Sequence, residues 1–224
     1  MRMEIKVIAR MQSAFPTKYG IPRQSGLVEI ASTIVFEPEY RQDEALRGIE
    51  GYSHLWLIWG FSETARDNWS PTVRPPRLGG NKRMGVFATR STFRPNGLGL
   101  SCVRLLGLEK TTHNGTAIRV SGADLMDGTP IYDIKPYLSF TDAHPDAVNG
   151  FADEVKSHAL KVDLPEEWAS HLDNDQRRTL AEILSQDPRP GYQHDPARIY
   201  GFTFNGLEIR YRVDGECLTV IEIV

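Results

Sequence analysis

The sequence contains few cysteines and no long hydrophobic segment. Its two cysteines, Cys102 and Cys217, each stand alone in an apolar run, so we expect buried, unpaired thiols in a reducing compartment. No segment approaches the ~20 apolar residues of a membrane helix. The first ten residues mix acidic and basic side chains with apolar ones, which is unlike a signal peptide. These absences predict a cytoplasmic protein without membrane contact.

Several common catalytic motifs are also missing. The chain has no CxxC, no HExxH and no cluster of Cys and His, so we expect no metal site. The glycines at 97 and 99 do not begin a dinucleotide fingerprint, because Cys102 stands where the third glycine belongs. Residues 51–55 are not a GxSxG nucleophile turn, because Leu55 replaces the second glycine. These differences exclude the Rossmann, zinc-enzyme and serine-hydrolase signatures.

Acidic residues are absent from one long segment. The whole chain has a net charge of -3, yet residues 68–108 contain seven Lys or Arg and no Asp or Glu. The seven are Arg74, Arg77, Lys82, Arg83, Arg90, Arg94 and Arg104. A segment with cations and no anions attracts phosphate or another anion. A solvated basic face without a partner is the alternative.

Strand-like segments dominate the first 140 residues. Apolar or alternating runs predict strands over 4–10, 27–36, 54–61, 84–89, 100–110 and 116–125, the last two joined by a turn at 113–115. Helical spacing predicts one helix over 39–51. Proline and glycine exclude regular structure from 67–83, and an extended stretch follows the turn that opens 127–137. Short strands with one helix predict a mainly β domain, an antiparallel barrel or sandwich.

The pattern changes after about residue 145. Residues 146–160 and 176–186 have helical or partly helical spacing. Residues 198–224 read as three strands, turned at Asn205-Gly206 and Asp214-Gly215, which are strong hairpin signals. We therefore predict two domains, a β domain over 1–145 and a smaller α+β domain over 146–224.

Polar clusters lie on loops at the ends of the predicted strands. They cover residues 21–26, 51–56, 71–83, 89–99 and 124–137. Loops held by rigid strands are where ligand contacts concentrate. Arg94 precedes Pro95 and Asn96 in a loop that the proline stiffens, and Asp133 stands between apolar residues, so it needs a partner if it is buried.

Several of these segments closely resemble the TrmO (YaeB/TsaA-like) family. The matching runs are GVFATRSTFRPN, VRPPRLGGN, DGTPIYDIKPY, IPRQSG, SHLW and QDPRPGY, and they extend over about residues 5–213. Two small departures from the family pattern are Gly97 and Gly191. Members of this family are S-adenosylmethionine-dependent methyltransferases that act on N6 of threonylcarbamoyladenosine at position 37 of certain tRNAs. The resemblance implies an antiparallel β-barrel N-terminal domain unlike a Rossmann methyltransferase, a smaller α+β C-terminal domain, and a homodimer with the cofactor near the subunit interface.

The resemblance also implies which residues contact S-adenosylmethionine. By motif position they are Gln24, Ser25, Gly26, Ser62, Glu63, Arg90, Leu100, Asp127, Gly128, Thr129, Pro130 and Ile131. Methylation of N6 is helped by removal of its proton, for which Asp133 and Tyr137 are the candidate acceptors. Arg94 and Asn96 are candidates to hold the threonylcarbamoyl group, whose carboxylate suits an arginine.

A tRNA substrate needs a basic approach surface. The candidates are Trp69, Arg74, Arg77, Lys82 and Arg83, with Arg189 and Tyr192 from the second domain, because unstacked anticodon-loop bases pack against aromatic and arginine side chains. Three alternatives remain open at this stage. They are methyl transfer to another RNA or a small molecule, a non-enzymatic RNA-binding barrel, and a hydrolase that uses Asp133 and His54.

Overall fold

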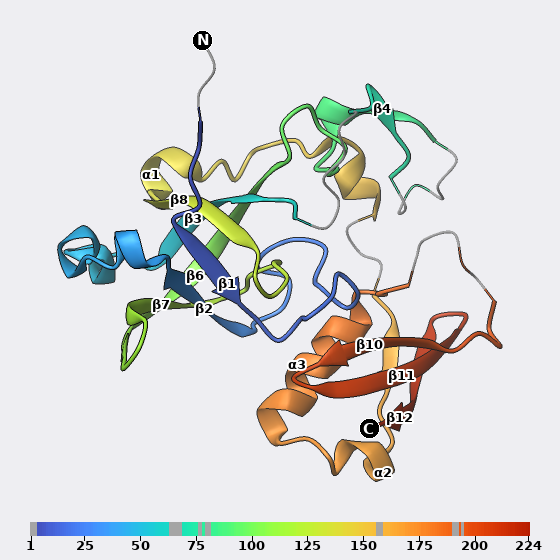
Figure 1. Ribbon diagram of the computed structural model, residues 1–224. Coiled ribbons are helices and arrows are strands. Elements are labelled where there is room, and N and C mark those ends of the chain that lie inside the picture. The colour runs from blue at the N-terminus through green and yellow to red at the C-terminus, as the bar shows by residue number, and fades with distance from the viewer. Residues whose placement is uncertain are drawn as a thin grey trace. The chain divides into compact units, whose positions relative to one another are not determined.

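A computed structural model describes residues 4–62, 69–75, 78, 82–155, 159–189, 193 and 195–224. The chain divides into two compact units (Figure 1). The N-terminal unit consists of Met1–Ala14, Gln24–Ser70 and Thr92–His144, and the C-terminal unit consists of Phe15–Arg23, Pro71–Ser91 and Pro145–Val224. Within the described residues, no helix combines the length and the apolar character that crossing a membrane requires.

The N-terminal unit is built on one antiparallel sheet. Its strands are β1 (Ala9–Gln12), β2 (Ala31–Phe36), β3 (His54–Gly60), β6 (Leu98–Thr111), β7 (Gly115–Ser121) and β8 (Pro130–Pro136). The ladder order is β1-β2-β7-β6-β3-β8, and β8 pairs back with β1 through Ala9 and Ile131. The sheet is therefore closed on itself, and the predicted mainly β architecture is confirmed.

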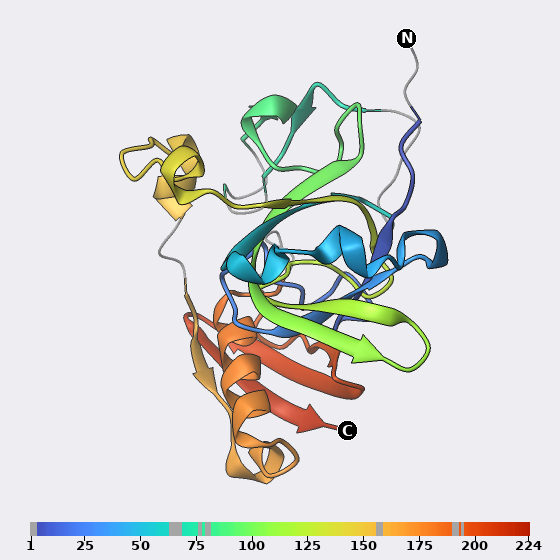
Figure 2. The same ribbon diagram turned by 90° about the vertical axis from the view of Figure 1, so that its left-hand side faces the viewer.

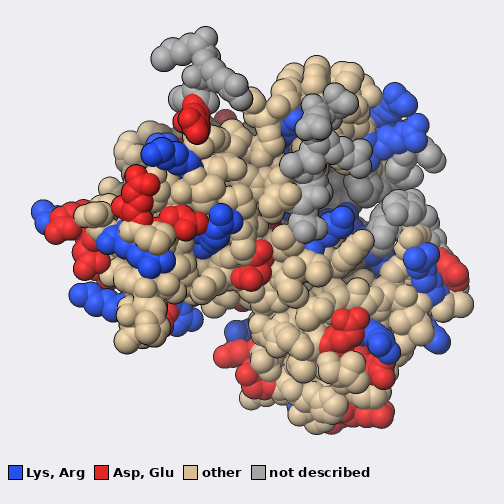
Figure 3. Space-filling view, in the orientation of Figure 1, with Lys and Arg blue, Asp and Glu red and all other residues tan. Residues whose placement is uncertain are grey.

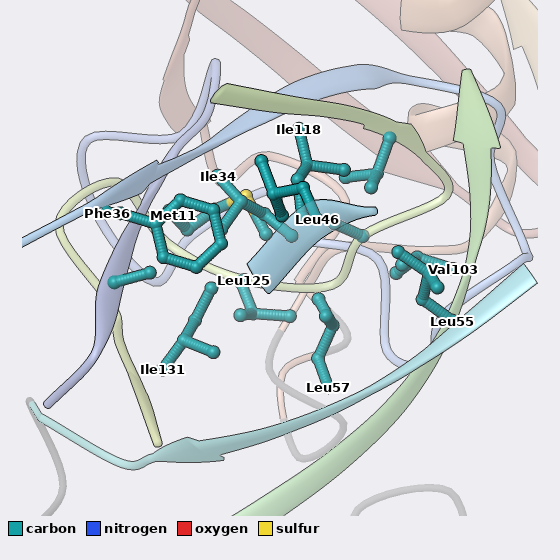
Figure 4. Packing of buried hydrophobic residues seen from close by; sticks show 13 residues of the cluster. Met11, Ile34, Phe36, Leu46, Leu55, Leu57, Val103, Ile118, Leu125 and Ile131 are labelled. Atoms are coloured by element: carbon teal, nitrogen blue, oxygen red, sulfur yellow. The ribbon is translucent and has the colours of Figure 1, made fainter. Parts of the chain in front are cut away.

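Alternating side chains of these strands fill the inside of the closed sheet. Leu55 and Leu57 of β3, Val103 of β6 and Ile131 of β8 are almost fully buried. They converge with residues of β1, β2 and β7 in one cluster (Figure 4). Each such side chain contributes about 1.5–3 kcal/mol on burial, so this cluster is the main source of stability of the unit.

Several predicted elements of the first 140 residues are wrong in detail. In place of a helix over 39–51 there are three 3₁₀ turns, η1 (Pro38–Tyr40), η2 (Asp43–Leu46) and η3 (Ile49–Gly51). Gly48 adopts φ +89° between the last two, a conformation that interrupts a continuous helix. The strand predicted over 4–10 begins only at Ala9, and the strand predicted over 27–36 begins at Ala31, where each first finds a ladder partner.

The proline-rich segment also differs from the prediction. A two-residue strand β4 (Thr72–Val73) pairs with β5 (Met84–Gly85), so regular structure is present inside 67–83. The strand predicted over 84–89 ends at Gly85, and the 3₁₀ turn η5 (Val86–Ala88) follows it. The backbone N–H of Val86 donates to the carbonyl of Pro71, which closes this small hairpin.

The C-terminal unit contains a four-stranded sheet. The predicted strands are confirmed as β10 (Tyr200–Phe204), β11 (Leu207–Asp214) and β12 (Cys217–Ile223). A fourth strand, β9 (Lys161–Asp163), pairs with β12 in parallel, so the order is β10-β11-β12-β9. The sequence analysis missed β9 because a three-residue strand has too short a pattern to recognise.

Helices complete the two units. The predicted helix over 176–186 is confirmed as α3 (Asn174–Ser185), which Asp173 and Gln176 begin with a capping box. It lies beside the four-stranded sheet in both views (Figures 1 and 2). The prediction over 146–160 reduces to a 3₁₀ segment η6 (Gly150–Val155), and two short helices were not predicted, α1 (Ser139–Asp142) and α2 (Glu166–Ala169).

The two cysteines are free but not fully buried. Cys102 lies on β6 and Cys217 begins β12, and both are half-buried. The prediction of buried thiols is wrong because both residues lie on strand faces that the unit covers only in part. Burial, together with the negative charge of Asp142, still raises the pKa of the Cys102 thiol.

Candidate functional site

One end of the closed sheet collects most of the residues predicted to bind a cofactor. Trp59 of β3 pairs with Gly99 of β6 on one side and with Ile131 of β8 on the other. The end of β3 therefore lies beside the starts of β6 and β8. Two strand spacings separate β6 from β8, about 10 Å. We call this the Gly60 end, after the last residue of β3.

The loop over residues 24–26 reaches the same end. The backbone N–H of Cys102 donates to Ser25 Oγ at 3.2 Å, and that of Gly26 donates to the carbonyl of Gly122 at 2.9 Å. Strand β6 pairs with β7 only from Arg104 onward. Beside Cys102, Ser25 therefore takes the position next to β6 that β7 takes from Arg104 onward.

The turn before β8 is held firmly to β1. Gly128 N–H donates to the carbonyl of Met11 at 2.8 Å, and Met11 N–H donates to the carbonyl of Thr129 at 3.0 Å. Asp127 Oδ1 accepts from the backbone N–H of Ser13 at 3.0 Å. The hydroxyl of Thr129 donates to the carbonyl of Met126 at 2.7 Å. The turn is therefore pre-formed, which lowers the entropic cost of binding a ligand there.

Glycines at the Gly60 end leave open space beside the backbone. A Cβ added to Gly26, Gly97 or Gly128 would meet no other atom within 4 Å. Leu100 next to them is 57% exposed, and Asp127 is also exposed. Room for close approach to the backbone, an apolar side chain and a carboxylate are what an adenosine-containing cofactor requires. These residues fit S-adenosylmethionine.

The candidate base Asp133 lies on the outer face of the closed sheet, near that end. Ile58 of β3 pairs with both Leu100 and Asp133, and directly paired residues project from the same face. A bulge opposite Ile58 and Trp59 places Tyr132 as the extra residue. The Asp133 carboxylate is 2.8 Å from Lys135 Nζ and 44% exposed. Asp133 is not buried, so the condition under which the sequence analysis required a partner is not met, although Lys135 pairs with it.

The second candidate acceptor, Tyr137, is not brought to the Gly60 end. It follows β8, and its ring packs against His54 at 6.0 Å and Trp56 at 5.7 Å between centroids. Four residues of strand separate it from Asp133, about 13 Å. His54 lies equally far along β3 from Ile58, the partner of Asp133, so the structure gives no support to a hydrolase that uses His54 and Asp133.

Asp142 lies near Trp56 on the outer face of the sheet, at the end opposite the Gly60 end. Its Oδ2 accepts from Trp56 Nε1 at 2.8 Å and from the backbone N–H of Leu138 at 3.0 Å. These hydrogen bonds, the one from Leu138 first, lower the pKa of the Asp142 carboxyl. Asp142 therefore anchors α1 to β3.

A chain of hydrogen bonds at the Gly60 end was not predicted from the sequence. Trp59 Nε1 donates to Ser101 Oγ at 2.9 Å, and Ser101 Oγ donates to Asp124 Oδ1 at 2.5 Å. Ser101 is 1% exposed. Gly99 makes room for the indole, since a Cβ there would lie 2.3 Å from it. The sequence signal was only that Ser101 and Asp124 interrupt apolar runs, which does not reveal that they meet Trp59.

The remaining predicted residues of the N-terminal unit lie in loops at this same end. Asn96 precedes β6 by two residues, and its carbonyl accepts from the N–H of Leu98 at 2.8 Å. Arg94 lies in the same loop, and Ser62 follows the end of β3. Glu63 lies outside the described residues. The Gly60 end therefore combines most of the predicted cofactor residues, though not Glu63 or Arg90, with the predicted substrate-holding loop.

The predicted basic approach surface is partly visible in the C-terminal unit. Arg74 follows β4 and Arg83 precedes β5, so the pairing of Val73 with Met84 brings them together. Arg74, Lys82 and Arg83 are exposed. Arg90, which was predicted to contact the cofactor, is also exposed and belongs to the C-terminal unit. Figure 3 shows Lys and Arg side chains at the place where Figure 1 draws β4. Arg77 and Tyr192 lie outside the described residues.

Arg189 has a different environment from the other predicted substrate contacts. It is 8% exposed, and its Nε and Nη2 donate to the two carboxylate oxygens of Asp187 at 2.8 and 3.0 Å. Burial, reinforced by the charge of Asp187, raises the pKa of the neighbouring Tyr211. Within the described part of the chain, no three His, Cys, Asp or Glu side chains gather as metal ligands would.

Two family models together match most of the chain. The one described as the tRNA-methyltransferase O N-terminal domain matches residues 10–143, and the TrmO C-terminal domain matches residues 157–224. This chain belongs to the TrmO family. The resemblance found in the sequence motifs is therefore confirmed.

Relatives and solved structures agree with the TrmO assignment. A tRNA (adenine(37)-N6)-methyltransferase of Escherichia coli K12 is 40% identical over 220 residues, which cover 94% of this chain and 93% of that protein. A Pseudomonas aeruginosa protein described as the putative S-adenosylmethionine-dependent methyltransferase RcsF is 41% identical, with the same coverage of each chain, 94% and 93%. The crystal structure of TrmO from Pseudomonas aeruginosa matches with a TM-score of 0.79 at 33% identity and covers 100% of both chains.

Proposed function

We propose that the protein is an S-adenosylmethionine-dependent tRNA methyltransferase that methylates N6 of the adenine at position 37, with threonylcarbamoyladenosine as its target base. The observation that carries the proposal is the Gly60 end. There the pre-formed turn over 127–130, the 24–26 loop and Leu100 come together in a chain of the TrmO family. The names of the relatives support the same activity.

The Gly60 end would hold the cofactor through backbone groups and one apolar side chain. Ser25, Gly26 and the turn over 127–130 offer polar backbone atoms, and Leu100 offers a surface for the adenine ring. When bound, S-adenosylmethionine supplies an electrophilic methyl group on its sulfonium. This chain contributes by orienting the target nitrogen toward that methyl group. Such orientation lowers the activation free energy by roughly 7 kcal/mol or more.

Asp133 is the better placed of the two candidate proton acceptors. It lies on the outer face in the same row as Leu100, and its carboxylate is 2.8 Å from Lys135 Nζ. The lone pair of N6 is delocalised into the purine, so an acceptor for its proton raises its nucleophilicity. Arg94 and Asn96, in the loop before β6, would hold the carboxylate of the threonylcarbamoyl group.

The role of Asp133 can be tested by Asp133→Asn. We expect turnover to fall about 10²- to 10⁴-fold, while the affinity for S-adenosylmethionine stays within about twofold because Asp133 is not among the predicted cofactor contacts. Asp163→Asn, an exposed aspartate of β9, is the control. Unchanged turnover in Asp133→Asn would exclude it as the base and leave Tyr137 as the candidate.

The two domains would divide the work. Residues 1–145 would form the cofactor-binding β-barrel built on the closed sheet, and residues 146–224 would contact the anticodon loop of the tRNA. Exposed Leu98, Leu100 and Leu106 on the outer face of β6, at 38%, 57% and 48%, support a homodimer, because exposed apolar patches mark association surfaces. A tRNA substrate is consistent with a cytoplasmic location.

Labelled S-adenosylmethionine tests the proposal directly. Methyl transfer is measured to two bulk tRNA preparations, one from normal cells and one lacking threonylcarbamoyladenosine. Label in the normal preparation alone is the expected result. Label in both keeps the methyltransferase and changes its substrate. Label in neither, together with no binding of S-adenosylmethionine, would favour a non-enzymatic RNA-binding protein.

A further inference from the structure

The C-terminal unit contains a pocket that the proposed function does not use. Its volume is about 300 Å³, and it lies between the segment over residues 18–23 and the end of α3 with the residues after it. Small-molecule pockets in proteins begin at about this size. The volume therefore suits one flat ligand of the size of a nucleotide, rather than an extended chain.

The walls of this pocket are fixed by buried polar contacts. Arg23 Nη2 donates to the carbonyls of Asp187 and Arg189, at 2.8 and 3.1 Å. Asp187 and Arg189 in turn form their two-pronged ion pair, with side chains 14% and 8% exposed. Gly20, at φ +81°, lies so close to the ring of Phe202 that a Cβ would be 2.2 Å from it. The segment 18–23 is thus held at Arg23 by hydrogen bonds and at Gly20 by close packing.

The lining combines an aromatic surface with positive charge. Tyr19 is 54% exposed, and Lys18 Nζ lies 5.7 Å from the centre of its ring. Ile21, which is half-buried, adds apolar surface. Three cations line the pocket, Lys18, Arg23 and Arg189, the last paired with Asp187. Among the residues that the structure describes, no Asp or Glu lines it.

This combination points to a particular ligand chemistry. An aromatic face with adjacent cations and no acid is how proteins grip unstacked nucleotides of single-stranded RNA. An apolar small molecule would not need the cations, and a bare anion would not need the aromatic and aliphatic walls. Gln186 on the rim offers both a donor and an acceptor to the edge of a base.

We propose that this pocket receives one unstacked nucleotide of the tRNA, with its base against Tyr19 and its phosphate facing Lys18 and Arg23. The proposal rests on the proposed function, because it takes tRNA as the substrate. Arg189 is then a positioning residue. It holds Asp187, and through the carbonyl contacts of Arg23 it shapes the pocket without touching RNA.

The test compares tRNA binding by matched variants of the full chain. Affinity for fluorescently labelled tRNA is measured for wild type, Tyr19→Ala, Tyr19→Phe and Lys18→Ala. Loss of one stacked base weakens binding by about 5- to 150-fold, so we expect this for Tyr19→Ala and near wild-type affinity for Tyr19→Phe. Lys18→Ala should reduce the salt slope of binding by about one. Affinity for S-adenosylmethionine should not change in any variant.

Exposed residues of the same types serve as controls. Tyr52→Ala, on a 39% exposed tyrosine, and Lys6→Ala, on a 70% exposed lysine, should leave tRNA affinity unchanged. Wild-type affinity in Tyr19→Ala, in an enzyme that still methylates tRNA, would overturn the pocket proposal alone. Wild type that neither binds nor methylates tRNA would overturn the proposed function and the pocket proposal together.

Discussion

In the N-terminal unit, Asp127 and Asp133 lie on the surface of the sheet, whereas in the C-terminal unit Asp187 and Arg189 face each other in the interior. All four belong to conspicuous polar motifs, DGTPIYDIKPY and QDPRPGY. At the Gly60 end, backbone pairing and the bond from Ser13 N–H to Asp127 hold the motif in place, and the carboxylates stay at the surface. Around Asp187 the charged side chains themselves hold the backbone. Polar residues in a motif can thus face a ligand directly, or they can fix the backbone that forms the ligand site.

The largest effect that tests this contrast is expected from Arg189→Ala. Removing one partner of a buried ion pair leaves the other charge uncompensated, which costs about 3–5 kcal/mol. We therefore expect a loss of that size in the free energy of unfolding, measured by urea denaturation. Arg189→Lys should recover only part of it, because lysine cannot make the two-pronged contact.

Arg178→Ala provides the matched control for Arg189→Ala. Arg178 pairs with Asp175 on α3, but the two side chains are 66% and 86% exposed, so we expect a loss below about 1 kcal/mol. Equal small effects of the two substitutions would show that the Asp187–Arg189 pair does not hold the backbone, and the contrast between the units would fail.

A smaller effect is expected from Gly99→Ala at the Gly60 end. The added methyl would lie 2.3 Å from the indole of Trp59, so the ring must move and its hydrogen bond to Ser101 must break. Overpacking of this kind costs about 1–3 kcal/mol, which thermal unfolding would detect. Affinity for S-adenosylmethionine should fall as well.

Gly51→Ala is the comparison for Gly99→Ala. A Cβ at Gly51 meets no atom within 4 Å, so its unfolding free energy should stay within about 0.5 kcal/mol of wild type. Unchanged stability in Gly99→Ala would mean that Trp59 has room to move. The hydrogen bonds that link Trp59, Ser101 and Asp124 would then not be needed for the structure of the Gly60 end.

The smallest effect concerns pH and Asp142. Its folded pKa is lowered below its ordinary value of 3.8 by hydrogen bonds to the carboxylate, so its contribution to stability is complete above that value and is lost as pH falls through the folded pKa. The difference in stability between wild type and Asp142→Asn, followed by denaturation from pH 5 to pH 2.5, should shrink toward acid pH. A constant difference would show that Asp142 does not titrate differently on folding.

Much of the fold was predictable because its signals are local. The turns at Asn205-Gly206 and Asp214-Gly215 and the capping residues of α3 determined their elements through neighbours in the sequence. The helix predicted over 39–51 failed because Gly48 at φ +89° interrupts a spacing that is otherwise helical.

The candidate site was predictable in its motifs but not in its geometry. The DGTP turn and Leu100 were found from the sequence, and their common position at the Gly60 end depends on the register of β3 with β6 and β8. The bulge opposite Ile58 and Trp59 changes the pairing of β8 with β3, so that Asp133 pairs with Ile58. No feature of the sequence indicates this bulge. The carbonyl of Arg189 likewise accepts a hydrogen bond from Arg23, which is 166 residues away in the sequence.

The two units are interleaved along the chain, which passes between them at residues 14–15, 23–24, 70–71, 91–92 and 144–145. This arrangement affects how the protein forms during synthesis. Strand β1 pairs with Ile131, and the segment that contains Gly20 packs against Phe202, so neither unit can be completed until distant residues have left the ribosome. Contacts of such long range slow folding, and we expect the nascent chain to remain dependent on chaperones until its last strands emerge.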